Sequence, residues 1–208
     1  MNEKPVWRVI RYIADLIEMN LLFLIFSIPV FTYGPASSAL YAVHLHMTDG
    51  EPVGFHDYVS SFRSSFRQTM KGTLVLMVPA AFLLYELYRL SGMKDVPNQM
   101  YVFVLVPLAC MVSLLNWVSI QGAFFECTLK QQLKNAVLLA IRSLLPSILM
   151  LLITLFPAFV FLTRSAAFFR VWPVWLFLYF SLSRSAMAFL TKKPMRALGD
   201  QLREQMNG

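Results

Sequence analysis

Residues 20–47 read NLLFLIFSIPVFTYGPASSALYAVHLHM, an apolar run that the pair Gly34-Pro35 interrupts once. A run of this length and polarity is typical of chain that is dissolved in lipid. Gly34 can adopt the backbone angles that end a helix, and Pro35 is well suited to the first turn of the next helix. The stretch therefore predicts a helix, a sharp corner at Gly34-Pro35 and a second helix.

The helix before the corner is expected to run without a break from about residue 6 to residue 33. Polar side chains before residue 20 recur at helical spacing and give this helix one polar face, formed by Arg8, Arg11, Asp15 and Glu18. Pro29 removes a backbone hydrogen bond and should bend this helix near Ile25. The helix after the corner, 35–47, is short for a crossing, because a perpendicular span needs roughly 20 residues.

Small residues recur four apart in the helix after the corner, at Gly34, Ser38 and Ala42. Such a ridge lets the backbone of a second helix approach closely. Ordinary packing between helices is a better explanation of the ridge than a ligand site.

Several short motifs in the first third of the chain are similar to those of the YesL-like family, small bacterial membrane proteins of unknown function. They are Asn20-Leu21-Leu22, Ser27-Ile28-Pro29, Gly34-Pro35-Ala36, Ala39-Leu40-Tyr41, Phe62-Arg63 and Phe66-Arg67-Gln68. Many relatives have Asn where this chain has Ser65. The resemblance implies an integral membrane protein that is often encoded beside carbohydrate ABC transporters and glycan-degrading enzymes, and it implies no chemistry.

The composition agrees with a membrane protein. Hydrophobic residues make up 58% of 208 positions and charged residues 14%, against roughly 45–50% and 25% in soluble domains. The net charge of +7 comes from basic residues that flank apolar runs, so membrane orientation and anionic headgroups explain it, and we expect no nucleic-acid partner. The sequence predicts an all-α fold, a polytopic membrane helix bundle in one domain over 1–208.

Apolar runs between charged segments predict about six transmembrane helices, at 12–33, 35–47, 70–90, 99–119, 141–162 and 171–190. With the N-terminus inside, the only Lys and Arg residues that would lie outside are Arg89, Lys94, Arg164 and Arg170. The positive-inside rule then predicts that both chain ends are cytoplasmic, in the bacterial inner membrane. If residues 35–47 entered the bilayer without crossing it, the excess of Lys and Arg on the cytoplasmic side would be smaller.

Two amphipathic segments, about 55–71 and 122–140, are expected to be cytoplasmic interfacial helices. Their cations Arg63, Arg67, Lys130 and Lys134 are the candidate contacts to a partner or to lipid. The sequence leaves two alternatives open: the apolar faces of these helices bind a partner helix, or they lie on the lipid surface. The segments also match each other in pattern 67 residues apart, as an internal repeat or by the chance agreement of periodic apolar patterns.

Candidate chemistry is sparse. His44, His46 and His56 lie near Asp49, Glu51 and Asp57. Because His44 and His46 are two apart on a helix, they point to different faces, and interfacial polar residues explain the group better than a metal site. Cys110 and Cys127 predict free thiols and no cofactor. Asn116 is a strongly polar group inside a span, and Glu86 and Arg89 can pair at i, i+3.

No enzyme motif accompanies these residues, so we expect a protein that is not an enzyme. The first hypothesis is an accessory component of carbohydrate uptake that contacts ABC transporter subunits or other membrane proteins, with the sugar link resting on the family resemblance. The alternative is a small secondary transporter, supported by the interrupted first hairpin and the kinking prolines.

Overall fold

The computed structural model describes residues 5–49, 51–93, 95–163 and 165–207. These residues are almost entirely helical and contain no strand, which confirms the all-α class for this part of the chain. The elements are α1 (Pro5–Phe26), the 3-10 turn η1 (Val30–Thr32), α2 (Tyr33–Thr48), α3 (Phe55–Ser91), α4 (Asn98–Phe124), α5 (Leu129–Arg142), α6 (Leu144–Thr163), α7 (Ser165–Arg170), α8 (Trp172–Val174), the π-helical η2 (Trp175–Tyr179) and α9 (Phe180–Asn207).

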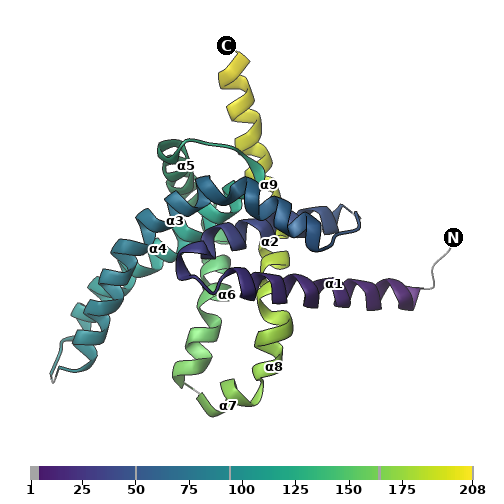
Figure 1. Cartoon of the computed structure of the whole chain (residues 1–208). Helices are drawn as coiled ribbons and strands as arrows, with labels where there is room; N and C mark the ends of the chain where they lie inside the picture. The colour runs from purple at the N-terminus through teal and green to yellow at the C-terminus, as the bar shows by residue number, and fades with distance from the viewer. Residues whose placement is uncertain (1–4, 50, 94, 164, 208) are drawn as a thin grey trace.

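The helices form two arms that meet at α2 (Figure 1). One arm is the antiparallel pair α3 and α4, and its tip is the turn at residues 92–97. The other arm holds α6 and the first part of α9, with α7 and α8 at its tip. α1 runs across the direction of the second arm, while α5 and the C-terminal end of α9 lie at the end of the molecule opposite the two tips.

The first helix ends earlier than the sequence predicted. α1 stops at Phe26, and Pro29 adopts an extended conformation (φ −74°, ψ 114°) just before the 3-10 turn. Pro29 therefore terminates the helix and does not bend it. The Thr32 hydroxyl donates to the carbonyl oxygens of Phe26 and Pro29, both at 2.6 Å, and so satisfies groups that the helix end leaves without partners.

The predicted corner at Gly34-Pro35 is displaced for the same reason. The chain turns at residues 27–32, and Gly34 and Pro35 lie in the first turn of α2, both buried. Proline is tolerated there because the first N–H groups of a helix have no partner within the helix. Gly34 serves close packing, because a Cβ at this position would lie 1.8 Å from the Oγ1 atom of Thr73 in α3.

The small-residue ridge of α2 packs against two helices, as predicted for Gly34 and Ser38. A Cβ on Gly122 of α4 would lie 2.8 Å from the Ser38 Oγ atom and 2.5 Å from the Oγ1 atom of Thr69. The backbones of α2, α3 and α4 are thus close together, with only small side chains between them.

The first predicted interfacial helix is not a separate element. Segments 55–71 and 70–90 form the single 37-residue helix α3. Its buried face is made of Tyr58 and small residues including Ser65 and Thr73, whereas the cations Arg63 and Arg67 are exposed. The Tyr58 hydroxyl donates to the carbonyl oxygen of Ala36 at 3.0 Å, so this end of α3 is fixed to α2 and does not lie freely on lipid.

The second predicted interfacial helix is a distinct element, α5, but it begins later than expected. Residues 125–128 are not helical, and Thr128 caps the helix by accepting from the N–H of Gln131. α5 ends at Arg142, and Ser143 (φ −117°, ψ 57°) separates it from α6. Because α3 is continuous at the matching position, the suggested repeat is not reproduced in the fold.

The predicted sixth span, 171–190, is divided among α8, η2 and the start of α9. The tail after residue 190 continues α9 and buries Met195 and Leu198 in the core. The short helix α7 lies between the predicted fifth and sixth spans.

Three of the described helices are long and apolar enough to cross a membrane, namely α3, α4 and α6. The most apolar stretch of α6 has only 11% of its residues buried inside the protein. Apolar surface of this extent is not stable in water, so the arms agree with a bilayer environment. The count of about six spans is not confirmed, because α1 carries four charges between residues 8 and 18 and α2 has only 16 residues.

Candidate functional site

The most unusual group inside the bundle is Arg184 of α9, whose side chain is only 3% exposed. The sequence interpretation counted Arg184 among the cytoplasmic cations that set the membrane orientation. The side chain is not a surface charge, because it lies in the interior where α9 meets α2 and α4.

Uncharged groups surround the guanidinium. Its Nη1 atom donates to the Tyr41 hydroxyl at 3.3 Å and to the Asn116 Oδ1 atom at 3.1 Å, and lies 3.3 Å from the Met187 sulfur. Its Nη2 atom donates to the Tyr33 hydroxyl. The guanidinium carbon also lies 5.7 Å and 5.4 Å from the ring centres of Tyr33 and Tyr41, within cation–π range.

Asn116 connects this cation to a third helix. Its Oδ1 atom accepts from Arg184, and its Nδ2 atom donates to the Oγ1 atom of Thr154 in α6 at 3.0 Å. The sequence singled out Asn116 as a polar group at membrane depth, and its side chain is 2% exposed. The amide therefore joins α4, α6 and α9 through buried hydrogen bonds.

A second polar contact lies one turn away on α9. The Ser181 hydroxyl is 3.1 Å from the Nε2 atom of His44 in α2, and its backbone N–H donates to the Asn20 Oδ1 atom at 2.7 Å. Ser181 directly follows the η2–α9 junction, so Asn20 of α1 satisfies a backbone donor next to the π-helical turn. We call the group Asn20, Tyr33, Tyr41, His44, Asn116, Ser181 and Arg184 the buried polar cluster.

The buried polar cluster contains no acidic side chain. Arg184 forms no ion pair among the described residues, although buried cations in proteins are normally paired with carboxylates. Arginine stays protonated in a protein, so the positive charge persists inside the bundle. The arrangement can hold a negative or strongly polar group. Its one hydroxyl beside a ring nitrogen, Ser181 with His44, has no carboxylate among the described residues to orient the ring.

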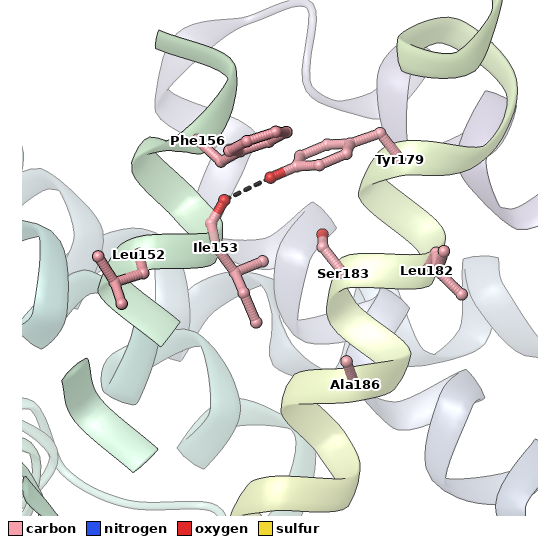
Figure 2. A pocket seen from close by; sticks show the side chains of 7 residues that line it. All are labelled: Leu152, Ile153, Phe156, Tyr179, Leu182, Ser183 and Ala186. Atoms are coloured by element: carbon pink, nitrogen blue, oxygen red, sulfur yellow. Dashed lines mark hydrogen bonds between the residues drawn. The ribbon is translucent and has the colours of Figure 1, made fainter. Parts of the chain in front are cut away.

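An apolar cleft of about 370 Å³ lies beside the cluster, between α6 and α9. Figure 2 shows Ile153 and Phe156 of α6 facing Tyr179 and Ser183 across it. The Tyr179 hydroxyl donates to the carbonyl oxygen of Ile153. This carbonyl has no intrahelical partner four residues on, because Pro157 lacks an N–H, so a side chain from a second helix satisfies it.

The structure leaves the four predicted contact cations exposed: Arg63, Arg67, Lys130 and Lys134. Arg67 lines a cleft of about 660 Å³ between α3 and the start of α5, together with Lys71, Glu126 and Thr128. Lys130 follows the lining residue Leu129 in the sequence but does not itself line the cleft, and neither Arg63 nor Lys134 lines it. The cleft therefore contains one of the four predicted residues and adds Lys71.

Gln68 fixes the geometry of this basic cleft. Its Nε2 atom donates to the carbonyl oxygen of Phe125 at 3.0 Å, and its Oε1 atom accepts from the N–H of Cys127 at 3.2 Å. The non-helical link between α4 and α5 is thus held against α3. Burial raises the pKa of the Cys127 thiol.

His44 and His46 lie on different faces as predicted, and His46 is exposed and pairs with Glu51 at 2.7 Å. The interfacial position predicted for His44 is wrong, because its side chain is buried between α2 and α9. Asp49 pairs with Lys192 of α9 at 2.8 Å, and this hydrogen bond holds the pKa of the Asp49 carboxyl below its usual range.

The predicted pair of Glu86 and Arg89 is confirmed at 3.3 Å, and both cysteines are free thiols. Of the predicted charges, Lys4, Lys94 and Arg164 lie outside the described residues, as do the side chains of Arg8 and Arg203.

These observations define an all-α fold with the surface of a membrane helix bundle. Residues 16–87 match the family described as "Protein of unknown function, DUF624", to which YesL-like proteins belong. The match runs from the second half of α1 through α2 to near the end of α3, and so contains Asn20, Tyr33, Tyr41 and His44 of the buried polar cluster. No curated protein and no solved structure matches the chain.

The sequence did contain a signal for Arg184. It is a lone cation in the predicted span 171–190, and an ionisable residue within a span is by default a functional candidate. Asn20 and Ser181 had no such signal, because single small polar residues are common in membrane helices.

Proposed function

We propose that this protein is a non-enzymatic membrane component that acts through contact with a partner protein on the cytoplasmic side. The observation that carries the proposal is the basic cleft, in which Arg67 and Lys71 are exposed beside a link that Gln68 holds in place. A fixed cationic cleft suits an acidic helix or loop of a partner, because complementary charge steers and orients docking. The association with carbohydrate ABC uptake rests on the family resemblance.

Affinity purification of the full chain in mild detergent tests the docking. Wild type is expected to recover transporter subunits, and the double variant Arg67→Glu, Lys71→Glu is expected to reduce that recovery at least about tenfold, because like charges repel across an interface. Arg89→Glu, a charge reversal at an exposed residue near the other end of α3, is the matched control and should recover them as wild type does. Equal recovery by the cleft variant would contradict the proposal.

We further propose that both chain ends lie in the cytoplasm, with the basic cleft at the inner face of the membrane. The clustering of α5 and the end of α9 away from the two tips supports this orientation (Figure 1). In a Cys110→Ser background, a membrane-impermeant maleimide is expected to label Cys127 only after the cells are permeabilised. Labelling at mildly alkaline pH compensates for the raised pKa of the thiol.

The external control for this orientation uses the turn at the tip of α3 and α4. Gly92→Cys in a chain without other cysteines is expected to react on intact cells, because Gly92 is exposed in that turn. Labelling of Cys127 on intact cells would reverse the orientation and place the cleft outside.

A small secondary transporter is the second candidate, favoured by one observation. The break at residues 27–32 and the π-helical turn η2 both lie near the buried polar cluster, and irregular helices around a polar site are typical of substrate sites in transporters. Accumulation of a substrate by the pure protein in proteoliposomes would favour transport over docking.

A further inference from the structure

The buried polar cluster has two nitrogen atoms without a hydrogen-bond partner among the described residues. They are the Nε atom of Arg184 and the Nδ1 atom of His44, and both side chains are more than nine-tenths buried. Buried polar atoms in native proteins are rarely left in this state, and each such case requires an explanation.

Both atoms can act as donors. The Nε atom of a guanidinium always carries a hydrogen. In the tautomer in which the Ser181 hydroxyl donates to the Nε2 atom of His44, the proton of the neutral ring is on Nδ1. Neither donor has an acceptor within the described protein, and no carboxylate pairs with the charge beside them.

The two donors belong to neighbouring turns of the same two helices. Ser181 and Arg184 are three residues apart on α9, and their partners His44 and Tyr41 are three residues apart on α2. Residues at this spacing share one helix face. The two groups therefore belong to the same contact between α2 and α9.

We propose that Arg184 and His44 bind a small anion inside the bundle, of the size of a halide ion or a carboxylate group. An anion would supply the missing acceptor and balance a charge that the chain itself leaves uncompensated. A cation would be repelled by Arg184, and a neutral ligand would leave the charge unbalanced. This site lies apart from the basic cleft and does not depend on a docking partner.

The test uses the purified full chain in mild detergent and follows thermal unfolding by tryptophan fluorescence. Sodium chloride and sodium acetate are each titrated against the sodium salt of a bulky sulfonate, MES, at constant ionic strength, so that general screening stays the same. At least one of the two anions is expected to raise the unfolding midpoint saturably, because a ligand that binds only the folded state stabilises it by mass action. A neutral disaccharide at equal osmolality should give no saturable rise.

Variants locate the effect. Arg184→Gln is expected to abolish the saturable rise, and His44→Gln is expected to raise the half-saturating concentration about tenfold, as loss of one donor to a charged group would. Arg63→Gln, an exposed cation on α3, is the control and should behave as wild type. If Arg184→Gln does not fold, the half-saturating anion concentration of His44→Gln alone tests the proposal.

Two results would overturn the proposal. One is the absence of any saturable effect of chloride and acetate on wild type. The other is a saturable effect that His44→Gln leaves unchanged, because the anion would then bind elsewhere. A saturable effect of the disaccharide without one of the anions would assign the cluster to a neutral ligand and equally reject an anion site.

Discussion

Asn116→Leu is expected to destabilise the protein by about 3 kcal/mol, because it takes the one amide acceptor from a buried guanidinium. Asn116 accepts from Arg184 at 3.1 Å and donates to Thr154 at 3.0 Å, and all of this occurs inside the bundle. Leucine has the same number and branching of side-chain heavy atoms as asparagine, so the substitution removes the hydrogen bonds without leaving a cavity. Reversible unfolding in detergent measures the difference in free energy.

Two further variants separate the charge from the neutral bond. Thr154→Val removes only the bond to the Asn116 Nδ2 atom and should cost about 1 kcal/mol, the usual size for a polar contact between membrane helices. Arg184→Met added to Asn116→Leu should recover about 2 kcal/mol of the loss, because the unpaired charge is then gone. A double variant whose loss equals the sum of the single losses would show that Asn116 and Arg184 are not coupled.

Gly34→Ala is expected to destabilise the protein by about 3 kcal/mol through overpacking. Alanine usually favours a helix by roughly 1 kcal/mol over glycine, so propensity alone predicts the opposite sign. The new Cβ would lie 1.8 Å from the Thr73 Oγ1 atom and 3.2 Å from the carbonyl oxygen of Thr69, and a backbone oxygen cannot rotate away. α2 must therefore move away from α3. The free energy of unfolding in detergent measures this loss.

The matched control for this variant is Gly92→Ala, at a turn where the nearest heavy atom would be 3.6 Å from the added Cβ. It should change the free energy of unfolding by less than about 0.5 kcal/mol. Gly34→Ala combined with Thr73→Ala removes the closest contact and should recover part of the loss. Equal stability of Gly34→Ala and Gly92→Ala would mean that α2 and α3 are not as close as the structure places them.

The sequence was informative where a pattern is long and local. The runs that became α3, α4 and α6 are apolar enough to be recognised alone, and the spacing of Gly34 and Ser38 identified the close contact of α2. The end of α1 was missed because Pro29 both bends and terminates helices, and which occurs depends on partners such as Thr32. The interfacial helix at 55–71 was missed as part of α3 because an amphipathic stretch can lead directly into a span without a break.

The candidate site was less predictable, since it depends on contacts between residues far apart in the chain. Asn116 was singled out from its chemistry, but its partner Arg184 is 68 residues away. Arg184 was taken for an orientation signal because it lies near the cationic tail, and only the packing of α9 on α2 shows that it is buried. Arg67 and Lys130 were found from helical spacing, which gives exposure but not the cleft that Gln68 maintains.

The hydrogen bond from Tyr179 to Ile153 has a mechanical consequence for the second arm. Proline leaves a membrane helix with a flexible joint, and before Pro157 the free carbonyl oxygen of Ile153 accepts from Tyr179 of η2 and not from α6 itself. α6 can therefore bend at Pro157 only if the hydrogen bond between Tyr179 and Ile153 breaks. This hydrogen bond couples any bending of α6 to its separation from η2 and α9.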